Sequence, residues 1–416
     1  MTKSNRLTLW IFIALVIGVI TGVWLNSTCP NNADGSGNVE LAVILDNITI
    51  LTDVFLRLIK MIIAPLVFAT LVVGVAKLGD IKAVGRIGGK TMLWFITASF
   101  ISLLLGCLLV NIFQPGLMMH LELPPVDAAT GVDKAAMTLR GFITHIFPKS
   151  VIEAMATNEI LQIVIFSLFF GVATAAIGEK GEPIIKLLDS VGHVMLKITG
   201  FVMYFAPLAV FAAMTAVVAK KGLGVLATYG IFIGEFYLGL ILLWLLLLFV
   251  AFLLVRKRIW NLVGRIKEPL LLAFSTASSE AAYPKTMEQL ERFGCKDKIV
   301  SFVLPLGYSF NLDGSMMYMT FASLFIAQSY GIHMPFDQQL SMLLVLMITS
   351  KGIAGVPRAS LVVIAGTLSS FGIPEAGLLL LLGVDHLLDM GRSATNVVGN
   401  AVATVAVSKW EKSLES

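Results

Sequence analysis

Polar and charged side chains interrupt an otherwise apolar stretch near the end of the chain, Gly383 to Val407. The two ends of this stretch are apolar and together long enough to cross a bilayer. Its middle carries seven polar or charged residues: Asp385, His386, Asp389, Arg392, Ser393, Asn396 and Asn400. A charge at the bilayer centre costs about 2.5–3.5 kcal/mol on insertion scales. Such groups persist only where they pair with one another, with ions or with a ligand.

Most of these side chains share one face if the stretch is helical. Steps of three and four residues place five of them together. They are Asp389, Arg392, Ser393, Asn396 and Asn400. The face offers an anion, a cation and amides, which predicts a site for something small and zwitterionic.

The composition is that of an integral membrane protein. The chain has 416 residues, of which 57% are hydrophobic and 13% charged, and its mean hydropathy is +0.90. The net charge of +4 is modest and the cations flank apolar runs, so we expect no nucleic-acid partner. Cys29, Cys107 and Cys295 lack metal-site spacing, and we expect free thiols or packing residues.

The apolar runs predict a multi-pass chain with a cytoplasmic N-terminus. Lys3 and Arg6 precede the first run, Leu7 to Leu25, which we expect to be retained, and the loop from Cys29 to Glu40 has acids but no Lys or Arg. Five further helices are predicted before residue 256. They cover about 47–78 with Pro65, 88–112, a broken segment 141–177 with Pro148, 183–219 with Pro207, and 226–255, with an outside loop at 117–140.

The pattern changes after residue 256. Residues 258–292 and 335–372 each hold two apolar runs too short for a core of about 30 Å. Each predicted hairpin is followed by a helix with a polar interruption, at Gly307–Ser315 and at Asp389–Asn400. Paired short segments and interrupted helices indicate an inverted-repeat transporter with a midplane site. The alternative is a pair of small-residue packing motifs in ordinary spanning helices.

Four motifs carry a family resemblance. In order they are Thr276-Ala-Ser-Ser279, Asn311-Leu-Asp-Gly-Ser315, Gly352-Ile-Ala-Gly-Val-Pro357, and Asp389-Met-Gly-Arg392 with Asn396. In these motifs the chain resembles the glutamate transporter family, the dicarboxylate/amino acid:cation symporters, and most closely its bacterial proton/glutamate-aspartate symporters. The resemblance extends over the whole chain, including Lys60–Pro65.

The resemblance implies an all-α membrane protein of eight transmembrane helices and two re-entrant helical hairpins, built from inverted repeats and assembled as a homotrimer. Such transporters work as elevators, in which a transport domain slides along a fixed scaffold. The scaffold would comprise residues 1–85 (helices 1 and 2) and 117–222 (the outside loop and helices 4 and 5). The transport domain would comprise residues 86–116 (helix 3) and 223–416 (helix 6, hairpin 1, helix 7, hairpin 2 and helix 8). Both termini would be cytoplasmic, in the inner membrane.

The resemblance also assigns the substrate site. Arg392 would bind the side-chain carboxylate of aspartate or glutamate, and Asp389 the ammonium group. The remaining substrate contacts would come from Ser278, Ser279, Gly355 and Val356 at the hairpin tips, with Asn396, Ser315 and Ser393. The alternative for Arg392 is a structural ion pair with Asp389 or Asp385.

The ion site departs from the sodium-coupled pattern. Asn311, Asp313 and Asn396 match sodium ligands of the family, and Gly307 lies in the same break. Three family oxygen ligands are missing, because Asn400 replaces a carboxylate, Phe95 an aromatic hydroxyl and Ala98 a threonine, which leaves Ser99. The smaller ligand count favours proton coupling, with sodium as the alternative and no firm metal site.

Proton coupling requires an acid inside the membrane. The animal members have a Glu where this chain has Met319, so the preferred proton carrier is Glu280, followed by Asp313 and Glu235. Arg358 would contact an acidic substrate, pair with Glu280 or face water. For His386 we expect helix packing.

The sequence therefore predicts a proton-coupled symporter that imports L-glutamate or L-aspartate, without enzymatic activity or a cofactor. Alternatives within the family are sodium coupling and a C4-dicarboxylate substrate. More remote alternatives are an ion channel, and an intramembrane protease using Asp313 and Asp389. A channel needs a continuous polar face, and no paired-aspartate protease motif is present in the sequence.

Overall fold

The computed structural model describes residues 3–29, 38–78, 81–119, 123–125, 144, 146–221, 224–350, 359–382 and 384–415. These residues are almost entirely helical and form no strand beyond one isolated bridge between Cys295 and Leu414. The all-α expectation is confirmed for this part of the chain.

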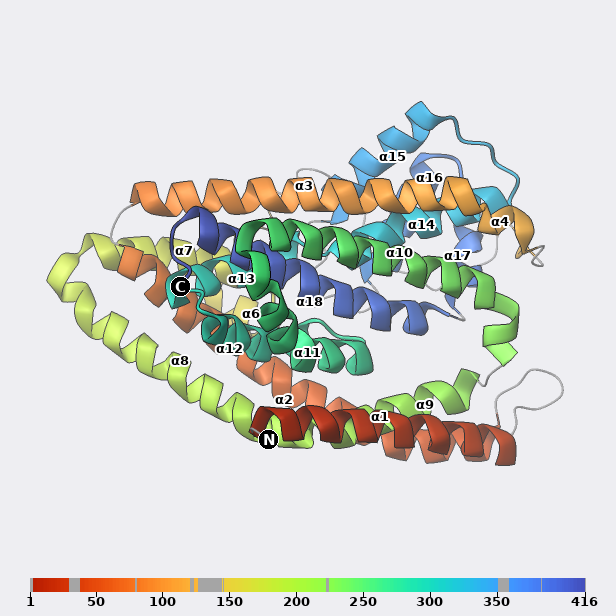
Figure 1. The fold of residues 1–416 in the computed structure, drawn as a ribbon, viewed down its shortest axis with the longest axis horizontal. Coiled ribbons are helices and arrows are strands. Elements are labelled where there is room, and N and C mark those ends of the chain that lie inside the picture. Colours follow the sequence, from red (N-terminus) through yellow and green to blue (C-terminus); the bar gives the residue numbers. More distant parts are fainter. Residues whose placement is uncertain are drawn as a thin grey trace.

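The elements follow one another along the chain with short breaks (Figure 1). They are α1 (Lys3–Thr28), α2 (Val39–Leu78), α3 (Ile81–Phe113), α4 (Pro115–Met118), α6 (Val151–Ala156), α7 (Ile160–Ala176), η1 (Gly178–Gly181), α8 (Glu182–Val202), η2 (Met203–Phe205), α9 (Ala206–Lys221), α10 (Gly224–Val255), η3 (Arg256–Arg258), α11 (Ile259–Thr276), η4 (Glu280–Ala282), α12 (Tyr283–Phe293), α13 (Asp297–Phe310), α14 (Asp313–Ser329), α15 (Phe336–Thr349), α16 (Ala359–Ser370), η6 (Glu375–Gly377), α17 (Leu378–Leu382) and α18 (Asp385–Trp410).

Several of these helices are long and apolar enough to cross a membrane. Among the described residues there are five such segments: Leu9–Thr28, Val39–Ala76, Lys82–Met118, Gly178–Lys220 and Tyr229–Thr276. A helix rises 1.5 Å per residue, so about 20 apolar residues cross a bilayer core. The chain is therefore built as a multi-pass membrane protein, whereas the count of eight spanning helices stays a prediction.

Two helix-turn-helix units lie where the short apolar runs predicted hairpins. Helices α11 and α12 contact each other, and so do α15 and α16. We call α11, η4 and α12 the first hairpin, and α15 and α16 the second hairpin. The tip of the second hairpin, with Gly352, Gly355, Val356, Pro357 and Arg358, lies outside the described residues.

The structure has breaks in two of the predicted segments, and it lacks the predicted interruption in a third. Pro148 interrupts the fourth segment as predicted, because Thr144 and Ile146 are helical and α6 begins only at Val151. A second break lies at residues 157–159, where Asn158 has a φ of 56°. The break near Pro207 is the single 3-10 turn η2, since proline removes a backbone donor there. The polar stretch from Asp389 to Asn400 does not interrupt its helix, because α18 is continuous and the chain breaks before it, at Val384.

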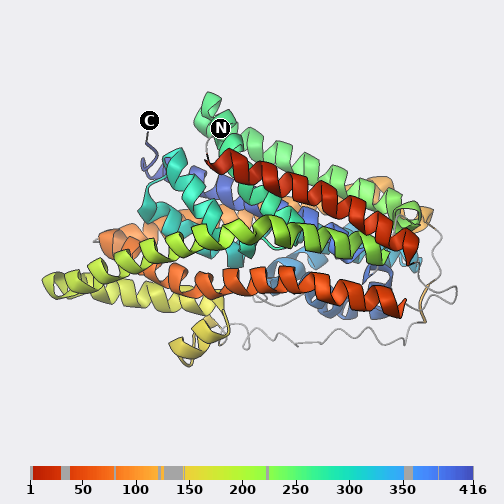
Figure 2. The ribbon, with the colours of Figure 1, turned by 90° about the horizontal axis from the view of Figure 1, so that it is seen from below.

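The helices pack into two groups. Helices α1 and α2 contact α9, and α2 also contacts α7 and α8. Figure 1 shows α1, α2 and α9 along one long side and α3 and α10 along the other, and Figure 2 confirms that α1 and α9 lie side by side. Helix α18 contacts α10, α11, α13 and α14 and is buried from Met390 to Ser408. Its polar face is therefore enclosed by protein.

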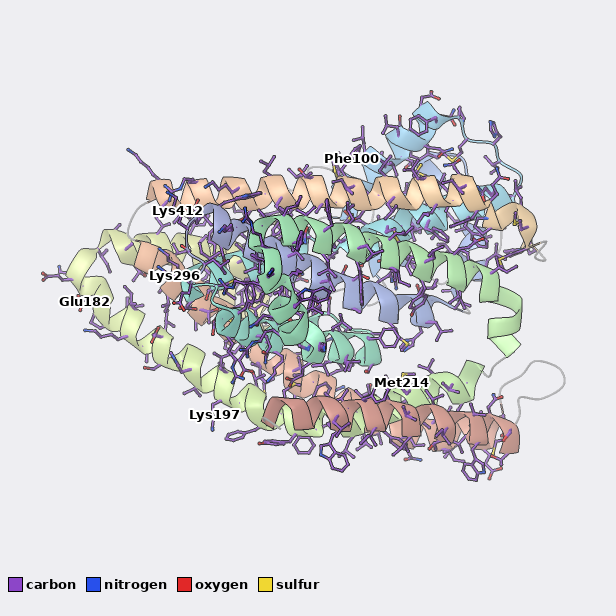
Figure 3. All side chains as sticks on the ribbon, in the orientation of Figure 1. Phe100, Glu182, Lys197, Met214, Lys296 and Lys412 are labelled. Carbon is purple, nitrogen blue, oxygen red and sulfur yellow. The ribbon has the colours of Figure 1, made fainter. Side chains whose placement is uncertain are left out.

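Charged residues gather at one end of the molecule. In Figure 3, Glu182, Lys296 and Lys412 lie toward the same end. There the segment after α18 is tied to α3, because the Glu411 carboxylate accepts from Arg86 Nη2 at 2.9 Å and from Lys90 Nζ at 2.6 Å. These contacts hold the end of α18 against the start of α3.

Candidate functional site

The break between α13 and α14 is docked onto α18 by one amide side chain. Asn396 Oδ1 accepts from the backbone N–H groups of Gly314 at 2.9 Å and Ser315 at 3.4 Å, and Asn396 Nδ2 donates to Ser315 Oγ at 3.2 Å. The first N–H groups of a helix have no partner within the helix. Asn396 supplies that partner to α14 from a neighbouring helix, so the predicted residues Ser315 and Asn396 meet.

A second set of predicted residues lies where the break between α13 and α14 meets a later part of α18. We call these residues, Asn311, Asp313, Asn396 and Asn400, the amide cluster. Asn311 Nδ2 donates to Asp313 Oδ2 at 3.1 Å and to Asn400 Oδ1 at 3.2 Å. Asn311 Oδ1 and Asn400 Nδ2 are buried and have no hydrogen-bond partner in the described part of the chain. The cluster therefore holds hydrogen-bonding capacity that its own members do not use.

Two glycines allow the amide cluster to close. A Cβ atom on Gly307 would lie 2.3 Å from Asn400 Oδ1, and one on Gly399 would lie 1.9 Å from Asp313 Oδ2. Neither position has room for a side chain. Gly307, predicted as part of the ion or proton site, lies against Asn400 by this close approach.

Helix α3 contributes few oxygens to the amide cluster. Ser102 Oγ lies 3.3 Å from Asp313 Oδ1, and Ser99 Oγ donates to the Phe310 carbonyl at 3.5 Å. Phe95 and Ala98 are buried on the same helix and bring no oxygen.

Three charged residues of α18 form a separate group with one tyrosine of α14. We call Asp385, Asp389, Arg392 and Tyr318 the charged cluster. Arg392 Nη2 lies 2.9 Å from Asp389 Oδ1 and 3.3 Å from Asp385 Oδ1. The guanidinium stacks over the Tyr318 ring at 4.0 Å, and the Tyr318 hydroxyl donates to Asp385 Oδ1 at 3.0 Å. The ion pairs that we considered as the alternative role of Arg392 are present.

These ion pairs use only part of the hydrogen-bonding capacity of Arg392. Its side chain is 2% exposed, and neither Nε nor Nη1 has a hydrogen-bond partner among the described residues. The Asp389 side chain is 33% exposed. A guanidinium with unused donors can grip a carboxylate, and a neighbouring accessible carboxylate can accept an ammonium group.

The first hairpin reverses at a residue with positive φ. Ala277 ends α11 with a φ of 48°, and the Ala281 N–H donates to Ser278 Oγ at 3.2 Å. The turn brings Ser278, Ser279 and Glu280 together at the tip, half-buried. The Ser278 hydroxyl thus caps the turn into η4, a local role compatible with a backbone contact to a ligand.

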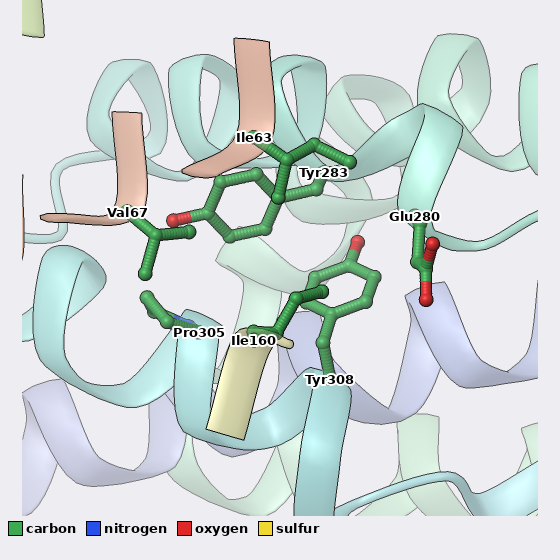
Figure 4. Close-up of a pocket in the computed structure, with 7 residues that line it drawn as sticks. All are labelled: Ile63, Val67, Ile160, Glu280, Tyr283, Pro305 and Tyr308. Carbon is green, nitrogen blue, oxygen red and sulfur yellow. The ribbon is translucent and has the colours of Figure 1, made fainter. Parts of the chain in front are cut away.

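Glu280 lies apart from both clusters. It lines a small cavity with residues from the first hairpin, α13, α2 and α7 (Figure 4). The other lining residues are Ile63, Val67, Ile160, Tyr283, Pro305 and Tyr308.

The other predicted residues are scattered. Glu235 is on α10, where its buried Oε2 has no hydrogen-bond partner in the described structure. Ser393 and Met319 are buried, and His386 is exposed on the first turn of α18.

Sequence reasoning did not single out the aromatic partners of α18. Besides Tyr318, Tyr237 donates its hydroxyl to the Leu387 carbonyl at 2.6 Å, and Trp244 Nε1 donates to Thr395 Oγ1 at 2.8 Å. Tyr318 could have been found, because it is one helical turn after Ser315 and shares its face. Tyr237 and Trp244 gave no such signal, since α10 is apolar all round.

A buried arginine–carboxylate group among membrane-spanning helices suits a carrier for a small charged solute. The model of the sodium:dicarboxylate symporter family matches residues 7–410. The chain belongs to this family, also called the glutamate transporter family.

Relatives with two kinds of name match nearly the full chain. A proton/sodium-glutamate symport protein of Geobacillus stearothermophilus is 43% identical over 96% of this chain and 93% of its own length. The protein of the same name from Bacillus caldotenax is 42% identical over the same shares. A C4-dicarboxylate transport protein of Laribacter hongkongensis is 38% identical over 100% of this chain and 92% of its own. The chain is thus a member of a family of symporters, which are not enzymes.

Proposed function

We propose that the chain is a secondary-active symporter that imports L-glutamate or L-aspartate together with protons. The observation that carries the proposal is the charged cluster on α18. Arg392 is buried with two nitrogens unused, beside an Asp389 carboxylate that stays accessible. The proposed ligand supplies the complementary groups, a carboxylate for Arg392 and an ammonium for Asp389.

The pairing of Arg392 with Asp389 also suits the empty site. A buried guanidinium without a counter-charge would be costly, and the two aspartates neutralise it before substrate arrives. A substrate carboxylate then adds to Arg392 at Nε and Nη1, while its ammonium restores charge balance at Asp389. Ser278, Ser279, Gly355 and Val356 are proposed to bind the main-chain carboxylate with Asn396, and Ser315 and Ser393 to complete the pocket.

Proton coupling is proposed from the chemistry of the amide cluster. A desolvated sodium ion favours several hard oxygens with carboxylate among them. Here Asp313 is the only carboxylate of the cluster, Asn400 supplies an amide, and Phe95 and Ala98 supply no oxygen. Sodium coupling through Asn311, Asp313 and Asn396 is the alternative.

Glu280 is proposed as the proton carrier. It belongs to the tip of the first hairpin and lines one cavity with Ile63 and Val67 of α2 and Ile160 of α7 (Figure 4). An ionised carboxylate that slides along an apolar wall is costly, so protonation permits the movement. Asp313 and Glu235 rank behind it.

The proposed architecture is an elevator in an inner-membrane homotrimer with eight spanning helices, two re-entrant hairpins and cytoplasmic termini. Residues 1–85 and 117–222 form the scaffold, and residues 86–116 and 223–416 the transport domain. The mutual contacts of α1, α2, α7, α8 and α9 support this division, and α11 and α13 form the main contacts between this group and the helices around α18.

The test compares accumulation with exchange in proteoliposomes. Glu280→Gln is expected to keep exchange of labelled glutamate across the membrane and to lose accumulation driven by a proton gradient. Glu235→Gln is the matched control, because it removes another half-buried acid and is expected to keep both activities. Normal proton-driven accumulation by Glu280→Gln would overturn the assignment of the proton carrier.

A C4-dicarboxylate substrate is the second candidate, and the relatives named C4-dicarboxylate transport proteins support it. The two substrates differ by an ammonium group, which Asp389 is proposed to bind. If succinate inhibits the uptake of labelled glutamate as strongly as aspartate does, the result would favour the second candidate.

A further inference from the structure

Two tyrosines beside Glu280 are buried with unused hydroxyls. Tyr308 on α13 is 4% exposed and Tyr283 on α12 is 2% exposed, and neither hydroxyl has a hydrogen-bond partner among the described residues. Their rings meet edge to face, with centroids 5.1 Å apart. Leaving a buried polar atom unpaired costs about 1–3 kcal/mol. Two such atoms on one cavity therefore require an explanation.

The two hydroxyls point in different directions. In Figure 4 the Tyr308 hydroxyl points toward the space between Tyr283 and Glu280, whereas the Tyr283 hydroxyl points away from Glu280, toward Val67. Tyr308 also interacts electrostatically with Glu280. Tyr308 is thus the neighbour whose polar atom is directed at the proposed proton carrier.

The remaining surroundings of Glu280 are apolar on the scaffold side. Ile63 and Val67 of α2 and Ile160 of α7 line the cavity. The titratable and charged groups that face Glu280 are Lys60 from α2, Tyr283 from α12 and Tyr308 from α13. Lys60 is exposed and acts on Glu280 through space. Thr286 lies beside the Tyr308 hydroxyl, and because its own proton is donated to the Ala282 carbonyl at 2.8 Å, it offers Tyr308 an acceptor only.

We propose that Tyr308 is a positioning residue for the coupling acid, whose hydroxyl donates to the Glu280 carboxylate when Glu280 is ionised and accepts from Glu280 when it is protonated. The inference rests on the proposed function, because it requires that Glu280 exchange a proton. A tyrosine hydroxyl can take both roles by rotating about its C–O bond. It thereby offers the acid a hydrogen bond in either state within an apolar cavity.

The placement of Tyr308 distinguishes it from Lys60. Helix α13 contacts both α12 of the first hairpin and α2 of the scaffold. In the proposed division α13 and the first hairpin both belong to the transport domain, so Tyr308 travels with Glu280 in an elevator movement. Lys60 belongs to α2 and stays with the scaffold. A partner that travels with the acid keeps its hydrogen bond throughout the crossing, whereas the attraction to Lys60 acts in some positions of the elevator only.

The test is the pH profile of uptake by Tyr308→Phe. The substitution keeps the ring and its contact with Tyr283 and removes the hydroxyl alone. The hydrogen bond to the ionised carboxylate is charge-assisted and stronger than the bond to the protonated acid, so on balance the hydroxyl favours the ionised form. Its loss is expected to move the midpoint of the external-pH profile of proton-driven uptake upward by about one pH unit. Substrate exchange at saturating glutamate should keep its rate.

Tyr283→Phe is the matched control, because it removes an equally buried and unpaired hydroxyl that points away from Glu280. Its midpoint is expected to stay at the wild-type value. An unchanged or lowered midpoint for Tyr308→Phe, or an equal rise for Tyr283→Phe, would overturn the role of Tyr308.

A second measurement covers the case in which Tyr308→Phe binds but no longer transports. Infrared difference spectra on lowering the pH contain a C=O band of the protonated acid, assigned through Glu280→Gln. Loss of the hydrogen bond is expected to raise the frequency of this band, and an unmoved band counts against the proposal. If Glu280→Gln keeps proton-driven accumulation, the proposed function fails whatever Tyr308→Phe does. If only the Tyr308 results are negative, the proposed function stands.

Discussion

Two regions of α18 differ in the side chains that they present to the neighbouring helices. In its first turns the charged cluster holds Arg392 between Asp385 and Asp389, with Tyr318 stacked on the guanidinium. Two turns later the amide cluster joins Asn396 and Asn400 to the break between α13 and α14. One region concentrates charge of both signs, and the other contains a single carboxylate among amides.

The difference separates two tasks along one helix. The charged cluster can recognise a ligand that carries both signs, because it provides unused arginine donors and an accessible carboxylate. The amide cluster docks a helix break and leaves one amide oxygen and one amide nitrogen unused. An amide group of this kind organises backbone, but it offsets the dehydration of a cation less well than carboxylates do. We therefore expect substitutions in the two regions to change different properties.

The largest effect is expected at Arg392. Truncating one side of a buried charged contact costs about 2–5 kcal/mol, or tens- to thousands-fold in affinity. Arg392→Cys should lose glutamate and aspartate uptake by this factor and admit serine or cysteine. Competition against labelled substrate in proteoliposomes measures the change. Arg392→Lys keeps the positive charge but loses the two-pronged guanidinium, so its glutamate affinity should lie between those of the wild type and Arg392→Cys. Wild-type glutamate affinity in both variants would refute the site.

A somewhat smaller effect is expected at Asp389, because this side chain is 33% exposed and water screens its charge. Asp389→Ser should weaken glutamate uptake by roughly tenfold to a hundredfold and admit succinate or fumarate. Asp389→Glu is the control that keeps the charge. An equal loss of glutamate uptake and succinate uptake would show that Asp389 holds Arg392 in place and does not bind the ammonium group.

The amide cluster can be moved toward sodium chemistry. Asn400→Asp adds a carboxylate of nearly the same shape beside Asn311. We expect sodium to stimulate uptake, with about a tenfold gain in sodium affinity, or about 1.4 kcal/mol. Uptake against sodium concentration at fixed pH measures this, and Phe95→Tyr with Ala98→Thr should add to it. If sodium still does not stimulate uptake by the variant, the missing oxygen ligands do not explain the lack of sodium coupling.

The smallest effect is expected outside both clusters, at Glu411. Hydrogen bonds from Arg86, assisted by Lys90, lower the pKa of this carboxyl. Because the folded-state pKa is lowered, the contribution to stability is present above the unfolded pKa and is lost as the pH falls through the folded one. Glu411→Gln should cost about 1 kcal/mol at pH 7. The difference should shrink as the pH falls below about 4.3, the ordinary pKa of a glutamate, and vanish below the lowered folded-state pKa. Thermal unfolding in detergent at both pH values tests this, and an equal cost at both would contradict the ionic origin.

The sequence was most informative where polar residues lie inside apolar runs. Steps of three and four on α18 predicted the shared face of Asp389, Arg392 and Asn396, and motif order predicted the break at Asn311. The same polarity misled the prediction for α18, because side chains that find partners on neighbouring helices need no break in their own backbone. Partners supplied by apolar helices, such as Trp244 and Tyr237, depend on how helices pack, which local patterns do not encode.

Imposing the proton gradient and the sodium gradient separately shows which ion drives accumulation. Proteoliposomes containing the wild-type protein receive either an inward proton gradient without sodium or an inward sodium gradient at clamped pH. We expect labelled glutamate to accumulate under the proton gradient and only to equilibrate under the sodium gradient. Accumulation under the sodium gradient alone would contradict this expectation and assign the coupling ion to Asn311, Asp313 and Asn396.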